Sequence, residues 1–169
     1  MEQWKEIKPE DLSGNPFEMI GQQWMLIAAE KEGRINAMTA SWGGMGVMWG
    51  KPVAFCCIRP QRFTKEFVNA AGEFSLTFFG KDSHDMLGYM GKVSGRQEDK
   101  IAHCGLTVLH HENVPYFGEA HTALVCKTLF AQPYSPDSFL FEDTRSQWYP
   151  QKDYHTLYIA EIKSALVRE

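Results

Sequence analysis

The stretch Asn36-Ala37-Met38-Thr39-Ala40-Ser41-Trp42-Gly43-Gly44 does most to decide the fold and the function of this 169-residue chain. It alternates small and polar residues and then reaches an aromatic one, which is typical of a β-strand. Thr39 and Ser41 are two residues apart, so their hydroxyl groups fall on one strand face and could serve one ligand. The small residues would let a flat ring lie against the backbone. A plain strand followed by a glycine-rich turn would explain the same pattern.

A second stretch, Ile58-Arg59-Pro60-Gln61-Arg62-Phe63-Thr64-Lys65, lies where a predicted strand ends and a predicted helix begins. Two arginines, a threonine and a lysine gather there. A helix N-terminus offers free amides and a positive dipole, so this junction predicts a phosphate site. A solvated charged turn is the alternative.

Short apolar runs bounded by glycine and proline predict mostly strands around these two stretches. The predicted strands cover residues 24–29, 36–42, 53–58, 74–79, 106–109, 120–131 and 154–166. The predicted helices are short and cover residues 65–71, capped by Thr64, 83–90 and 99–104. Gly43, Gly44 and Gly46 are expected to break the second strand, and the run 120–131 is long enough to contain a bulge. The pattern predicts a mainly β protein, a closed or nearly closed barrel with short inserted helices.

Composition narrows the class of protein. Apolar residues make up 44% and charged residues 22%, which suits one globular domain over residues 1–169. The net charge of −4 argues against nucleic acid as the main partner. The start of the chain has no apolar signal core, and no apolar run approaches the length of a membrane span. Four cysteines form no disulfide framework, and Cys56 and Cys57 should point to opposite strand faces. We therefore expect a reduced, cytoplasmic protein.

Other segments carry weaker signals. The polar loop 91–100 could close over a ligand through Ser94 or Lys100, although a surface loop is the simpler account. His155 lies at the start of the last predicted strand, where a structural role is the more common one. The adjacent His110 and His111 would diverge on a strand, so we expect no metal site. The long connection 134–152 is rich in aromatic residues, and long connections are often functional.

Taken together, these segments resemble the flavin reductase-like FMN-binding split-barrel family, and its flavoredoxin branch in particular. The resemblance is carried by residues 36–42, Lys51-Pro52-Val53-Ala54-Phe55, residues 58–64, Ser94-Gly95-Arg96 with Asp99-Lys100, Gly105-Leu106-Thr107, and Asp153-Tyr154-His155. These pieces follow the order seen in the family and span nearly the whole chain.

The resemblance implies a homodimeric split barrel of Greek-key type, with FMN bound near the dimer interface. The residues it places along the isoalloxazine ring are Asn36, Met38, Thr39, Ala40, Ser41 and Trp42. Those it places at the phosphate are Arg59, Arg62 and Thr64, with Lys65 beside them. Ser94 and Lys100 would approach the flavin from the other side. His155 would lie near the reactive edge, as the candidate catalytic residue.

Family membership leaves the reaction open. The chain could be an NAD(P)H-dependent flavin reductase, or a flavoredoxin-like electron carrier with tightly bound FMN and a protein electron donor. A split barrel binding another flat cofactor, such as haem, is a third reading, for which the sequence offers no axial ligand. The aromatic stretches Phe139-Leu140-Phe141 and Trp148-Tyr149 support the homodimer, because a monomer of this size would struggle to cover them.

Overall fold

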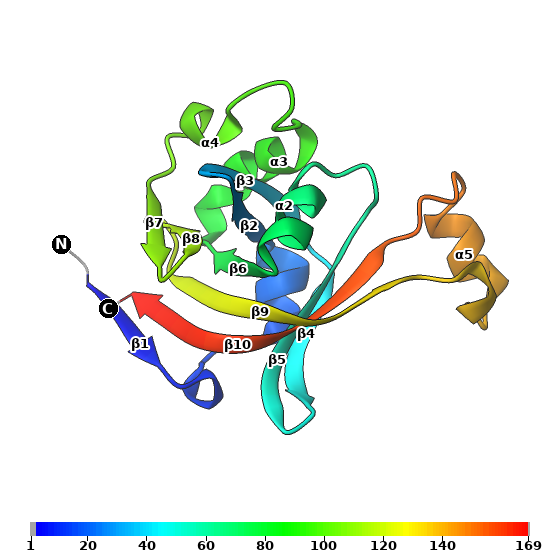
Figure 1. The fold of residues 1–169 in the computed structure, drawn as a ribbon, viewed down its shortest axis with the longest axis horizontal. Helices are drawn as coiled ribbons and strands as arrows, with labels where there is room; N and C mark the ends of the chain where they lie inside the picture. The colour runs from blue at the N-terminus through cyan, green and yellow to red at the C-terminus, as the bar shows by residue number, and fades with distance from the viewer. Residues whose placement is uncertain (1–2, 169) are drawn as a thin grey trace.

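The chain folds into a strongly curved antiparallel sheet with short helices packed beside it (Figure 1). The structure is a computed structural model and describes residues 3–168, so both ends of the predicted domain 1–169 lie outside it. The strands are β1 (Trp4–Ile7), β2 (Met25–Lys31), β3 (Arg34–Ala40), β4 (Gly43–Met48), β5 (Lys51–Ile58), β6 (Glu73–Phe78), β7 (Val108–His111), β8 (Val114–Phe117), β9 (Thr122–Pro133) and β10 (Thr156–Arg168). The helices are α1 (Pro16–Glu18), α2 (Thr64–Ala71), α3 (His84–Lys92), α4 (Lys100–His103) and α5 (Glu142–Trp148). A π-helical turn covers Met19–Gln23, and 3-10 turns cover Pro9–Asp11, Lys81–Ser83 and Pro136–Ser138.

The strand order explains why the sheet is a split barrel. The hydrogen-bonded path runs β3-β2-β6-β9-β10-β5-β4, with β1 paired to β10, while β7 and β8 form a separate hairpin. β3 and β4 lie at opposite ends of this path, yet only Ser41 and Trp42 separate them in the chain. The sheet must therefore curl until its ends approach each other, although no ladder joins β3 to β4 within residues 3–168. The expectation of a mainly β fold with short inserted helices is confirmed.

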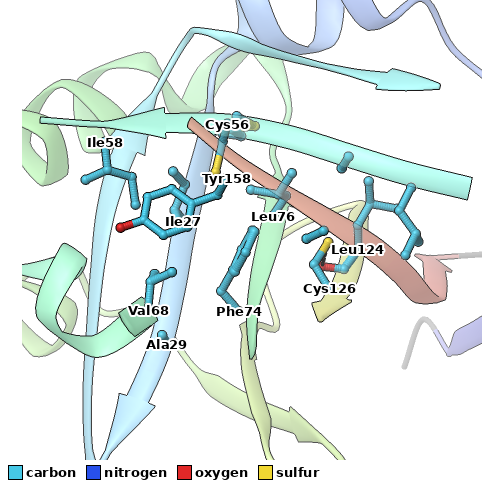
Figure 2. Close-up of a cluster of buried hydrophobic side chains, with 14 of the residues drawn as sticks. Ile27, Ala29, Cys56, Ile58, Val68, Phe74, Leu76, Leu124, Cys126 and Tyr158 are labelled. Carbon is cyan, nitrogen blue, oxygen red and sulfur yellow. Dashed lines mark hydrogen bonds between the residues drawn. The ribbon is translucent and has the colours of Figure 1, made fainter. Parts of the chain in front are cut away.

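The barrel interior is filled by alternate residues of facing strands. Phe74, Leu76 and Phe78 of β6 point inward together and are fully buried, as their alternation predicts. Figure 2 shows Phe74 and Leu76 close to Cys56, Cys126 and Tyr158 in this core. All four cysteines are free thiols.

The opposite face of β2 is buried as well. Leu26 and Ala28 pack with Leu87 and Met90 of α3, whereas Ile27 faces the barrel interior. Because both faces of β2 are covered, its sequence is a continuous apolar run and does not alternate.

The second predicted strand ends at Ala40, but the glycines that were expected to break it form a strand of their own. Gly43 to Met48 form β4, which pairs with β5. A Cβ atom on Gly44 would lie 2.3 Å from Cζ of Phe55, and one on Gly43 would lie 2.2 Å from the Phe55 carbonyl oxygen. Glycine is therefore required at position 43, where backbone occupies the place of a Cβ, while at position 44 the Phe55 ring fills the space that a side chain would need.

β9 and β10 form a long hairpin whose far end projects from the body of the sheet, with α5 at its tip (Figure 1). The bulge expected in residues 120–131 is confirmed, because Phe130 pairs with Ile159 and Thr128 with Ala160, which leaves Leu129 without a partner position. We call residues 134–155 the arm. α5 lies within the connection 134–152, where no apolar period indicates a helix.

Two smaller differences concern the remaining elements. β1 and β8 are four-residue strands that the sequence pattern did not indicate. Thr64 is the first residue of α2, and Phe63 occupies the capping position without a side-chain hydrogen bond. Within residues 3–168, no helix is both long and apolar enough to cross a membrane.

Candidate flavin site

The largest concentration of predicted site residues lies in a cavity of about 520 Å³ where β3, β5 and the arm meet. We call it the Arg62 cavity. It is lined by Met38, Thr39, Ala40, Ser41, Trp42, Cys57, Arg59, Gln61, Arg62, Trp148 and His155. Of the predicted residues, Met38 to Trp42, both arginines and His155 are thus brought together.

One wall is the end of β3 and the two residues that follow it. Thr39 and Ser41 both reach the cavity, as their spacing predicts. The Thr39 hydroxyl donates to the Leu87 carbonyl of α3 at 2.5 Å. The proton of this hydroxyl is thereby occupied, so toward a ligand Thr39 can offer only a lone pair.

Asn36 and Thr64 do not line the cavity, but they connect two segments that do. Both are buried, and the Asn36 Nδ2 donates to Thr64 Oγ1 at 2.8 Å. This bond ties β3 to the first turn of α2, and therefore holds the arginine-bearing turn against the strand that carries Met38 to Trp42.

Of the two arginines that line the cavity, Arg62 has more donors left for a ligand. Its Nη1 donates to the Gly91 carbonyl at the end of α3, at 2.6 Å. It has no carboxylate partner among residues 3–168. Burial, and then the charge of Arg59, lower the pKa of Arg62. A half-buried cation beside a second cation is electrostatically unfavourable unless an anion joins them, so the cavity favours an anionic ligand.

Arg59 has a partner of its own. Its Nη1 forms a 2.6 Å ion pair with the Asp153 carboxylate, and its Nη2 donates to the Trp148 carbonyl at 3.0 Å. The guanidinium also lies 5.1 Å from the centre of the Tyr149 ring. Arg59 therefore fastens the arm to the end of β5, and these contacts use part of its hydrogen-bond donors.

His155 lines the cavity, and no backbone carbonyl within residues 3–168 is bonded to its ring. Its Nδ1 lies 2.7 Å from the Tyr149 hydroxyl, and the ring packs 5.1 Å from Trp42. Burial, followed by the charge of Arg59, lowers the pKa of His155 to about 4. The imidazole is therefore neutral at pH 7.

Sequence reasoning missed three residues of the lining, Cys57, Gln61 and Trp148. Cys57 could have been found by alternation, since Cys56 faces the core and its neighbour must face the other way. Burial raises the pKa of Cys57 to about 11, so it is a neutral thiol. Trp148 was predicted to lie at the surface of a homodimer, and the sequence did not indicate that it lines the cavity.

The remaining predicted residues lie elsewhere. Lys100 is 3% exposed and lines a separate cavity of about 520 Å³, which we call the Lys100 cavity. Its Nζ donates to the Met90 carbonyl at 2.7 Å and the Val93 carbonyl at 2.9 Å. The Ser94 hydroxyl accepts from the Arg96 amide at 3.2 Å. Neither Ser94 nor the half-exposed Lys65 lines the Arg62 cavity.

Among residues 3–168, no three His, Cys, Asp or Glu side chains gather as a metal site would require.

Comparison with known proteins identifies the family. The sequence model of the flavin reductase like domain matches residues 17–169, so the chain belongs to that family. An uncharacterized protein of Aeropyrum pernix is 29% identical over 103 residues, which are 59% of this chain and 39% of that protein. The chain thus matches well under half the length of that relative.

Solved structures share the fold. An FMN-binding domain of a flavin reductases-like enzyme from Shewanella baltica superposes with a TM-score of 0.71 at 18% identity, over 98% of this chain and 78% of that one. Flavoredoxin from Methanosarcina acetivorans gives a TM-score of 0.67 at 21% identity, over 85% of this chain and 67% of that one. The family expected from the sequence is confirmed.

Proposed function

We propose that this chain is an FMN-binding oxidoreductase of the NAD(P)H-dependent flavin reductase type, with FMN in the Arg62 cavity. The observation that carries the proposal is Arg62, a half-buried guanidinium without a carboxylate partner in residues 3–168, next to the small-residue end of β3. A cavity of about 520 Å³ falls in the usual range for small-molecule sites.

The residues present fit FMN in both charge and shape. Arg59 and Arg62 carry two positive charges, and Asp153 neutralises one of them, which leaves net positive charge for a phosphate. Arg62 is the main phosphate ligand in this proposal, and Arg59 contributes with the donors that its contacts to the arm leave over. Met38 to Trp42 provide the flat wall for the ring, with Trp148 contributed by the arm.

FMN, once bound, supplies the hydride or electron chemistry. The chain binds the flavin, orients it and keeps water from one side of it. His155 holds a proton at a ring nitrogen within the cavity, while its neutral state avoids a third positive charge beside the two arginines. We assign His155 a role in reduction of the flavin more than in its binding.

Anaerobic reduction tests the activity. The FMN-loaded protein is mixed with NADH, NADPH or dithionite, and the visible absorbance of oxidised flavin is followed. Bleaching by a nicotinamide, together with turnover of added FMN, supports the reductase. Bleaching by dithionite alone contradicts it, and then favours the flavoredoxin-like carrier that receives electrons from a protein donor.

The proposed functional unit is a homodimer. Large apolar side chains stay exposed on the β4–β5 hairpin and the arm, including Val47 at 78%, Leu140 at 89% and Phe141 at 74%. Of the aromatic stretches noted in the sequence, Tyr149 is buried within the chain and Phe139 is half-buried, so Leu140, Phe141 and Trp148 remain for a second copy. A monomer mass by light scattering at micromolar concentration, with FMN present, would contradict the dimer.

A further inference from the structure

Tyr149 and His155 form a buried pair inside the arm, next to the Arg62 cavity. Tyr149 is 5% exposed and His155 is 8% exposed. The Tyr149 hydroxyl oxygen and His155 Nδ1 are 2.7 Å apart. Tyr149 directly follows α5 and His155 directly precedes β10, so both ends of the pair are held by regular structure.

The number of protons on the two side chains decides whether the Tyr149 hydroxyl or His155 Nδ1 donates this hydrogen bond. A neutral imidazole carries one N–H, on either Nδ1 or Nε2. If Nδ1 carried it, the ring would donate to the phenol oxygen, and the phenol proton would need another acceptor. Within residues 3–168 the hydroxyl of Tyr149 has no other hydrogen-bond partner, and a buried hydroxyl without an acceptor is costly. The phenol must therefore donate to Nδ1, which leaves the ring proton on Nε2.

The surroundings favour the neutral ring and leave Nε2 available. The charged groups near His155 are Arg59, Asp153 and Arg62, and burial together with Arg59 keeps the imidazole uncharged at pH 7. The neighbouring rings of Trp42 and Tyr134 fix its plane, at centroid distances of 5.1 Å and 6.3 Å. Nε2 makes no hydrogen bond to the described protein atoms, while the ring itself lines the cavity.

We propose that Tyr149 is a positioning residue that fixes His155 as its Nε2–H tautomer, so that the ring offers the Arg62 cavity a neutral hydrogen-bond donor. The part that concerns the ligand rests on the proposed function, because the acceptor would belong to FMN. Such a donor stabilises negative charge on a ligand without placing another fixed charge beside the arginines. Tyr149 would act only through His155.

Nuclear magnetic resonance reads the tautomer directly in the flavin-free protein. Histidine is labelled with ¹⁵N, and long-range ¹H–¹⁵N spectra at pH 7 show which ring nitrogen carries the proton. His155→Asn identifies the signal. We expect His155 to be protonated on Nε2 alone. A proton on Nδ1 would overturn the inference, whether or not the protein binds flavin.

Two variants test the role of Tyr149. Tyr149→Phe removes only the hydroxyl, and we expect the single-tautomer pattern of His155 to be lost. Tyr154→Phe is the matched control, since its ring packs 5.0 Å from Tyr149 without bonding to His155, and it should leave the pattern unchanged. An unchanged pattern in Tyr149→Phe would show that Tyr149 does not set the tautomer.

The midpoint potential of bound FMN tests the donor. In Tyr149→Phe it should become more negative, because the reduced flavin loses a partner for its negative charge, while Tyr154→Phe should match the unaltered protein. An unchanged potential in a Tyr149→Phe variant that has lost the single tautomer would overturn the donation to the ligand. Failure of the unaltered protein to bind FMN would instead overturn the proposed function, and the tautomer would still be decided by the flavin-free spectra.

Discussion

The Arg62 cavity and the Lys100 cavity have equal volumes of about 520 Å³, and each contains a basic side chain that the sequence assigned to flavin binding. Their chemistry differs. Lys100 donates to two backbone carbonyls, and its cavity also contains the acidic residues Glu98 and Asp99. Arg62 donates to one carbonyl and has no acidic partner within residues 3–168.

A buried positive charge therefore does not by itself make an anion site. The end of α3 receives both cations, since Arg62 donates to Gly91 while Lys100 donates to Met90 and Val93. Carbonyls at a helix C-terminus attract cations, so part of each charge serves the fold. Of these two cations, Arg62 is the one that lines a cavity with a wall of small residues.

Arg62→Ala should give the largest effect. Loss of a charge-assisted contact to phosphate costs about 1.5–3 kcal/mol, which corresponds to about 10- to 150-fold weaker FMN binding. Riboflavin lacks the phosphate, so its affinity should change little. Lys65→Ala is the matched control, because Lys65 does not line the cavity. Fluorescence titration with both ligands measures the effect, and equal losses for FMN and riboflavin would mean that Arg62 acts through folding.

His155→Asn should slow reduction of bound FMN by a nicotinamide about fivefold to tenfold, the order expected for one lost hydrogen bond. FMN affinity and melting temperature should stay close to those of the unaltered protein, because the asparagine amide oxygen can accept from the Tyr149 hydroxyl in place of Nδ1, while no donor remains at the position of Nε2. Stopped-flow absorbance without oxygen measures the rate. A lowered melting temperature with an unchanged rate would assign His155 a structural role only.

Arg59→Ala should reduce the affinities for FMN and riboflavin by more similar factors than Arg62→Ala does. Arg59 also fastens the arm through Asp153 and Trp148, so its removal should weaken both ligands by several-fold as the wall formed by Trp148 loosens. The same fluorescence titration gives the ratio of the two affinities. A larger ratio for Arg59 than for Arg62 would show that the Asp153 ion pair opens to receive the phosphate.

Lys100→Met should affect FMN affinity least, by less than about twofold, because Lys100 does not line the Arg62 cavity. Its effect is on stability. Burial, followed by the charge of Arg62, lowers the pKa of Lys100 to about 8 from 10.5. Between these values the unfolded chain binds more protons than the folded one, so the unfolding free energy should rise with pH in the unaltered protein. Urea unfolding from pH 7 to 10.5 should show that rise reduced in Lys100→Met, and parallel curves would contradict the buried ammonium.

The sequence predicted the two main segments of the Arg62 cavity. Residues 36–42 and 58–64 were predicted as site segments from residue type, strand spacing and family resemblance together. The Asn36–Thr64 hydrogen bond shows why these two segments lie against each other. Alternation also placed Cys56 and Cys57 on opposite faces, with Cys56 in the core and Cys57 in the cavity.

The features that the sequence did not predict depend on tertiary contacts. Nothing local in Lys100 indicates that it turns toward the carbonyls of α3, because that direction is set by how α3 and α4 pack. The glycines of β4 resemble a strand break in the sequence, but in the structure Phe55 occupies the space that side chains at Gly43 and Gly44 would fill. The arm has no apolar period, so neither α5 nor the placement of Trp148 and Tyr149 at the cavity could be predicted from periodicity.

The visible absorption spectrum of the purified protein, with flavin quantified per chain after release, shows whether the Arg62 cavity is a flavin site. We predict a yellow protein that holds one FMN per subunit, or takes one up when FMN is added, and that binds FMN more tightly than riboflavin. A colourless protein that gains no flavin absorbance on mixing with FMN would contradict the proposed site.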